Sequence, residues 1–177
     1  MKKIKIFLAS SIEDLKIDRL EVGDFFGLLN DIYISHDIFF SLVKCEDYDN
    51  AIAANGKQSQ YDAEIRDSEL IFFLFFKTVG DYTKHEFDVA LESFLSHGKP
   101  KISVYFKSPT DEATAEVKEY MNTLTMEKNF HYNIYENIDT LKLGIIMQIK
   151  CMYPECSDID ICGGKVYLNG RVVANKC

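Results

Sequence analysis

The sequence predicts an α/β domain built around a five-stranded parallel sheet. Strand-like apolar segments alternate five times with segments whose apolar residues recur at helical spacing, which is the pattern of strands joined by crossover helices. The segment 70–76 contains no polar residue, as expected for a central parallel strand buried on both faces. These two observations favour the flavodoxin-like strand order 2-1-3-4-5 in a three-layer sandwich.

The first half of the chain supplies the first two strand–helix units. Residues 3–9 are the first predicted strand, and Ser10 or Ser11 is expected to cap a helix that runs to about Leu29. Residues 38–45 form the second strand. The polar stretch 46–60 predicts a long loop placed to cover a site at the same sheet edge. A short helix over 61–67 follows.

The second half completes the sheet. Apolar residues at helical spacing follow the strand at 70–76, and Gly98 ends that helix before Pro100. Residues 101–106 are the fourth strand, Ser108-Pro109-Thr110 opens a helix to about Leu124, and residues 130–135 are the fifth strand. Asn137 is expected to cap the last helix.

Pro154 marks the predicted end of this domain, which spans residues 1–154. In the extension 155–177, strand patterns at 165–168 and 171–174 flank Asn169-Gly170, which predicts a β-hairpin with a type I′ turn. Because a lone hairpin is marginal in water, it either packs on the domain or begins a following module. We expect the chain to be fused to further C-terminal domains.

Composition excludes several classes of function. The chain has 177 residues, 47% of them hydrophobic, with 20 Lys and Arg against 28 Asp and Glu and a net charge of −8. Such an acidic chain is a poor binder of nucleic acid. No segment approaches the roughly 20 apolar residues of a membrane span. The five cysteines form no C-x-x-C pair, so we expect free thiols in a cytoplasmic protein and no metal site.

The predicted topology brings two distant segments to one crevice. In the order 2-1-3-4-5, ligands bind beyond the carboxyl ends of strands 1 and 3. Strand 1 ends at Ala9, Ser10 and Ser11, and the loop after strand 3 delivers Tyr82 and Glu86. Backbone N–H groups after Ser10 are expected to hold a phosphate. Glu86, expected in the first turn of its helix, would hold a ribose hydroxyl or stabilise a cationic ribosyl centre.

Each candidate residue also has a structural interpretation. Thr83-x-x-Glu86 fits a capping box, in which the glutamate only closes the helix end. Ser10 and Ser11 serve a helix cap equally well, and Tyr82 suits packing as much as stacking. Arg66 belongs to a charged helix face but is within reach of a phosphate. His85 and the glutamines near the loop are expected to be solvated.

The segments FLASSIEDL at 7–15, DAEIRDSELIFFLF at 62–75 and GDYTKHEFDVAL at 80–91 resemble TIR-like domains of bacterial defence and signalling proteins. The resemblance covers about residues 3–153. It implies NAD cleavage at the nicotinamide–ribose bond, with NAD as substrate rather than cofactor, by a glutamate in an aromatic-x-x-x-Glu motif. Tyr82 to Glu86 matches that spacing, with Tyr for the commoner Trp. Glu86 also resembles the catalytic glutamate of nucleoside deoxyribosyltransferases.

Three functions follow as hypotheses. The first is an NAD-cleaving effector domain of a defence or signalling protein, with self-association needed for activity as the resemblance implies. The second is a non-catalytic module for self-association or nucleotide recognition. The third is a nucleoside or nucleotide N-glycosidase or deoxyribosyltransferase.

Overall fold

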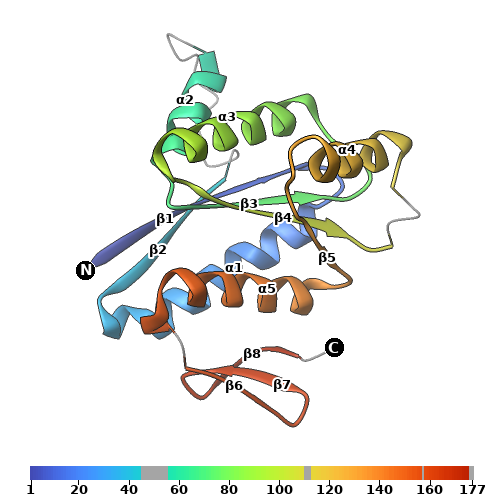
Figure 1. The fold of residues 1–177 in the computed structure, drawn as a ribbon. Coiled ribbons are helices and arrows are strands. Elements are labelled where there is room, and N and C mark those ends of the chain that lie inside the picture. Colours follow the sequence, from blue (N-terminus) through green and yellow to red (C-terminus); the bar gives the residue numbers. More distant parts are fainter. Residues whose placement is uncertain (45–55, 110–112, 157, 176–177) are drawn as a thin grey trace.

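The computed structural model describes residues 1–44, 56–109, 113–156 and 158–175 and confirms the predicted sheet (Figure 1). Within these residues, five parallel strands lie in the order β2-β1-β3-β4-β5. Their bounds are β1 Lys2–Ser10, β2 Ile38–Lys44, β3 Leu70–Phe75, β4 Lys101–Lys107 and β5 Asn133–Tyr135. β5 is shorter than predicted: its pairing with β4 begins at Asn133, and the N–H of Phe130 bonds back to the carbonyl of Leu124 near the end of the preceding helix.

Side chains alternate between the two faces of the sheet, and this alternation divides the core into two clusters. On β3, Leu70, Phe72 and Leu74 point to one face, where α1 (Lys16–Tyr33) and α5 (Ile138–Met152) pack. Ile71, Phe73 and Phe75 point to the opposite face and belong to the second cluster. All six of these side chains are buried, as the uninterrupted apolar run of β3 predicts.

The second face is covered by α2 (Gly56–Asp67), α3 (Asp81–His97) and α4 (Ala115–Met126), which Figure 1 shows on the side opposite α1 and α5. The three-layer sandwich is therefore as predicted. Gly98, at φ 75°, caps α3, and the Asn137 side chain accepts a hydrogen bond from the Thr140 N–H at the start of α5. Both helix boundaries agree with the sequence. The described residues also include the 3₁₀ turns η1 (Ile34–His36) and η4 (Pro154–Cys156).

Three helix starts differ from the predictions. α1 begins at Lys16, after a turn, and its N-cap residue Leu15 makes no side-chain cap bond. The predicted cap at Ser10 or Ser11 is therefore wrong. α2 begins at Gly56, so the helix takes in the end of the predicted loop 46–60, of which residues 46–55 lie outside the described chain. α4 begins after Thr114, whose hydroxyl accepts from the Val117 N–H at 3.4 Å, rather than at residues 108–110.

The C-terminal hairpin forms as predicted and gains a third strand. β7 (Lys165–Leu168) and β8 (Arg171–Asn175) flank Asn169 and Gly170, whose φ angles of 47° and 75° are both positive, as a type I′ turn requires. β6 (Ile159–Cys162) adds to β7 on its other edge. Buried side chains of this sheet belong to the core cluster of α1 and α5, so the sheet packs on the domain.

The described cysteines carry free thiols: Cys151 and Cys162 are exposed, and Cys156 is buried. Cys45 and Cys177 lie outside the described residues. Among the helices of the described chain, none has the length and apolar character needed to cross a membrane.

Candidate active site

A cleft of about 610 Å³ opens at the switch point between β1 and β3. The parallel register pairs Ser10 with Leu74, so the two strands end side by side and their following loops meet there. The volume suits a small-molecule ligand. Four segments form the walls: the end of β1 with the residues that follow it, the first turns of α2, the β3–α3 connection and the first turns of α3. The lining residues are Leu8, Ala9, Ser10, Ser11, Ile12, Gln58, Tyr61, Thr78, Gly80, Tyr82, Thr83 and Glu86.

The structure brings most of the predicted site residues together in this cleft. Ala9, Ser10, Ser11, Tyr82 and Glu86 all line it. Tyr82 is 75% exposed at the rim, so it does not serve the core.

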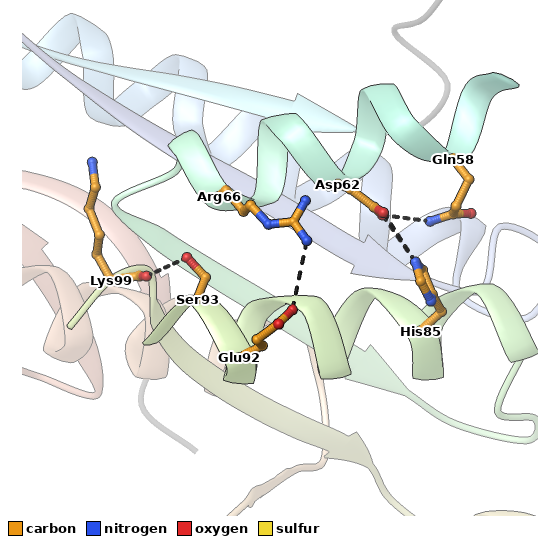
Figure 2. A network of polar contacts seen from close by, with 7 residues as sticks. All are labelled: Gln58, Asp62, Arg66, His85, Glu92, Ser93 and Lys99. Atoms are coloured by element: carbon orange, nitrogen blue, oxygen red, sulfur yellow. Dashed lines mark hydrogen bonds and ion pairs between the residues drawn. The ribbon is translucent and has the colours of Figure 1, made fainter. Parts of the chain in front are cut away.

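Arg66 does not line the cleft. It lies on α2 with its guanidinium 3.8 Å from the carboxylate of Glu92 on α3, a pair drawn in Figure 2, and both side chains are exposed. The phosphate interpretation of Arg66 therefore has no geometric support in this cleft.

Glu86 lies in the second turn of α3, one turn later than predicted. The helix begins at Asp81 with Gly80 as its N-cap, and Thr83 is already helical. A capping box needs the glutamate three residues after the N-cap residue. The interpretation of Thr83 and Glu86 as a capping box is therefore wrong.

Glu86 is instead a buried acid, only 6% exposed. Burial raises the pKa of Glu86 to about 7, because desolvation disfavours the carboxylate; nearby Arg19 lowers it and Asp62 adds to the rise. At neutral pH the group is poised between its acid and carboxylate forms.

Arg19 is a buried charge beneath the cleft that the sequence reasoning missed. Its side chain is 2% exposed, and Nη1 donates to the Ser10 hydroxyl at 2.5 Å and to the Ser10 carbonyl at 3.2 Å. Its charge also acts on Glu86. A cationic group therefore fixes the end of β1 at the point where the helix N-terminus was expected. Since α1 begins only at Lys16, the N–H groups after Ser10 form no helix end for a phosphate.

Asp14 ties the two loops of the switch point together. Its Oδ2 accepts hydrogen bonds from the backbone N–H groups of Lys77 at 3.1 Å and Thr78 at 3.2 Å. Burial opposes its ionisation, but hydrogen bonds from Ser11 and from these backbone groups hold the pKa of Asp14 below its ordinary value. This carboxylate therefore positions the β3–α3 loop.

A polar network joins α2 to α3 beside the cleft. Figure 2 shows Asp62 between Gln58 and His85: the Gln58 amide nitrogen lies 3.1 Å from Asp62 Oδ1, and His85 Nε2 lies 3.2 Å from the same oxygen. His85, predicted to be solvated, is half-exposed but bound. Gln58, also predicted to be solvated, lines the cleft.

The cleft has no obvious metal chemistry of its own. Among the described residues, no group of three or more His, Cys, Asp and Glu side chains is placed to hold a metal ion. The cleft instead combines one buried carboxyl group with hydroxyl and amide side chains.

The chain has a distant structural likeness among solved proteins. It is similar to a CMP N-glycosidase. That protein, from Clostridium botulinum, is 18% identical to this chain, and the match covers 81% of this chain and 98% of the other with a TM-score of 0.48. No family model and no curated protein matches the chain. At this distance the likeness assigns no function, so the chemistry must be inferred from the cleft itself.

A buried carboxyl with a pKa near neutrality suits two tasks. Its carboxylate form stabilises a cation that develops within the cleft, and its acid form donates a proton. Because the Glu86 carboxyl group is buried, its interaction with a developing cation is stronger here than in water. The arrangement is therefore suited to a substrate whose reacting centre becomes cationic.

Proposed function

We propose that this chain hydrolyses the N-glycosidic bond of a nucleotide in the cleft between β1 and β3. The observation that carries the proposal is Glu86, a buried acid with a pKa of about 7 in the wall of a nucleotide-sized cleft. Cleavage of a ribosyl–nitrogen bond passes through a centre with oxocarbenium character, which a nearby carboxylate stabilises.

In this reaction Glu86 acts as the carboxylate facing C1′ of the ribose. The C1′–N bond breaks, and its electron pair leaves with the base. A water oxygen then bonds to C1′. A base that is uncharged in the substrate, such as cytosine in CMP, leaves as an anion and takes the proton released from that water. Nicotinamide is cationic in NAD and leaves as a neutral molecule, so in that case the proton goes to solvent. Ser10 and Ser11 line the same cleft and offer hydroxyl groups to the sugar or phosphate.

The substrate class has two candidates within this proposal. NAD is the one that the TIR-like motifs imply, since Tyr82 and Glu86 have the spacing of the aromatic-x-x-x-Glu motif. A nucleoside 5′-monophosphate is the other, and CMP belongs in the test because it is named for the similar glycosidase. Either substrate leaves the same assignment for Glu86. A role in bacterial defence rests on the resemblance alone.

The test is release of free base from NAD, CMP and the other common nucleoside monophosphates, followed by chromatography with product identification. Glu86→Gln should reduce turnover by at least about 1,000-fold, because it removes the charge that stabilises the transition state. Glu92→Gln is the matched control, since Glu92 is an exposed glutamate on the same helix. It should retain activity.

Protein concentration is the second variable of this experiment. Turnover that rises more than linearly with concentration would support the self-association that the resemblance implies. Absence of base release from every substrate at all concentrations would contradict the proposal and favour the non-catalytic interaction module.

A further inference from the structure

Gln58 occupies the wall of the cleft with a fixed amide orientation. The residue lines the cleft from the first turns of α2, and its Nε2 donates to Asp62 Oδ1 at 3.1 Å. A carboxylate has acceptor sites only. The amide nitrogen must therefore be the end of Gln58 that faces Asp62, and Figure 2 shows the amide oxygen on the opposite side.

Asp62 is itself held in place. His85 Nε2 lies 3.2 Å from Oδ1 and 3.3 Å from Oδ2 of Asp62. Since the carboxylate accepts, this ring nitrogen is the one that carries the proton. The Asp62 side chain is only 19% exposed, so the carboxylate is held between α2 and α3 rather than moving freely in solvent.

These contacts leave the amide oxygen of Gln58 on the side of the amide away from Asp62, in a residue that lines the cleft. The oxygen cannot exchange places with the nitrogen without setting an oxygen against the Asp62 carboxylate. The network thus presents an acceptor of fixed identity to whatever fills the cleft.

We propose that Gln58, oriented by the Asp62–His85 pair, selects nucleotides whose leaving base carries an amino or carboxamide NH₂ group. The base NH₂ donates to Gln58 Oε1. A base with a carbonyl or carboxylate oxygen at that position places two acceptors against each other and is rejected. This inference rests on the proposed function and adds to it the chemical class of the base.

The experiment compares matched substrate pairs that differ at this one group: CMP with UMP, AMP with IMP, and NAD with its nicotinic acid analogue. For the pair that contains the substrate, the wild-type protein should favour the NH₂ member by about 10-fold or more in kcat/KM, as a site built around a hydrogen bond does. Gln58→Leu, similar in size but without an acceptor, should reduce that ratio to within about threefold of one. Gln60→Leu, on the exposed side of α2 and outside the cleft, is the control and should keep the wild-type ratio.

A second variant tests the orientation step. Asp62→Asn can donate as well as accept, so it no longer dictates which end of the Gln58 amide faces the cleft, and the preference should fall with Gln58 unchanged. This variant also removes a negative charge near Glu86. Arg19 and Asp62 are the charged groups that act on Glu86, and Asp62 raises its pKa. The pH at which activity rises should therefore move lower in Asp62→Asn and stay unchanged in Gln58→Leu.

Binding keeps this inference separable from the proposed function. Calorimetric titration of the Glu86→Gln variant with each substrate pair measures the preference without turnover. If no nucleotide binds and none is cleaved, the proposed function fails. If nucleotides are bound or cleaved but the wild type shows no NH₂ preference, or Gln58→Leu retains it, the role of Gln58 is overturned while the proposed function stands.

Discussion

Burial of Glu86 lowers the stability of the folded protein by an amount that can be measured. Burial raises the pKa of Glu86 from 4.5 to about 7, so the folded state holds this proton more tightly than the unfolded chain does. Stability is therefore lost as pH rises between these two values, by about 3 kcal/mol in total. Such a cost is typical of functional acids, whose environment serves chemistry rather than stability.

We therefore predict that Glu86→Gln is more stable than the wild type at alkaline pH. The advantage in unfolding free energy should grow by about 2–3 kcal/mol between pH 5 and pH 8, because the glutamine has no charge to desolvate. Urea unfolding at several pH values measures it. The exposed-site variant Glu92→Gln should show no such growth. A Glu86→Gln protein that is less stable than the wild type at pH 8 would mean that favourable contacts hold the carboxylate.

At the scale of single residues, the sequence predicts that Ser10 and Glu86 line one cleft, but it does not predict the roles of Arg19 and Gln58 beside them. Ser10 and Glu86 meet because parallel strands end at one sheet edge, which strand order alone determines. The burial of Arg19 could have been predicted from the sequence. Arg19 lies four residues after Leu15 and three before Val22, on the apolar stripe of α1, where a charge is unusual. The position of Gln58 in the cleft could not be predicted, because it depends on where α2 begins.

At the element scale, buried strands were predictable and helix starts were not. The apolar run of β3 is enough to predict a central strand. The start of a helix, in contrast, depends on which group the nearby polar side chains bind. Asp14, which precedes α1, accepts hydrogen bonds from the backbone N–H groups of Lys77 and Thr78 across the switch point. α2 is mostly polar, with Ile65 buried in the core, so the spacing of apolar residues gives little guide to its first residue.

A buried polar cluster fixes α1 against the outer strands of the sheet. Asp18 of α1 accepts from Lys107 Nζ at the end of β4 at 3.0 Å and from the Tyr135 hydroxyl at the end of β5 at 2.7 Å. The Asp18 side chain is 7% exposed, and that of Lys107 is 26% exposed. This cluster holds the carboxyl edge of the sheet on the side of β4 and β5.

Removing the Lys107 ammonium from this cluster should destabilise the protein, because it leaves the buried Asp18 carboxylate without its cationic partner. We expect Lys107→Met to lower the unfolding free energy by about 2–3 kcal/mol, discounted for the partial exposure of the lysine. Lys101→Met is the matched control at the other end of β4, where the exposed ammonium lies 4.9 Å from the Phe94 ring. It should cost less than about 1 kcal/mol. Equal losses in the two variants, measured by urea unfolding, would show that the Asp18 pair adds nothing.

At the scale of the whole molecule, the C-terminal sheet shares its core with the α/β sandwich. Val166, Leu168 and Val173 are buried in one cluster with side chains of α1 and α5. A polar contact joins the same parts, since Asn175 of β8 donates to Asp139 of α5 at 2.7 Å. Just before the sheet, Tyr33 of α1 donates to the carbonyl of Cys156 in η4 at 3.3 Å. A three-stranded sheet of this size has little core of its own. Its stability must therefore come from the sandwich.

Shared packing predicts that the two parts unfold together. Calorimetry of the wild type should give one transition, and Leu168→Ala should lower it as a whole by roughly 5–15 °C, because a cavity in a common core costs about 2–4 kcal/mol. Val172→Ala, at an exposed position on β8, should shift the transition by only a few degrees at most. A separate transition for the small sheet, sensitive to Leu168→Ala while the main transition stays in place, would instead make residues 158–175 an independent module. One common transition would show that the sandwich, with its switch-point cleft, and the small sheet up to β8 unfold as a single cooperative unit.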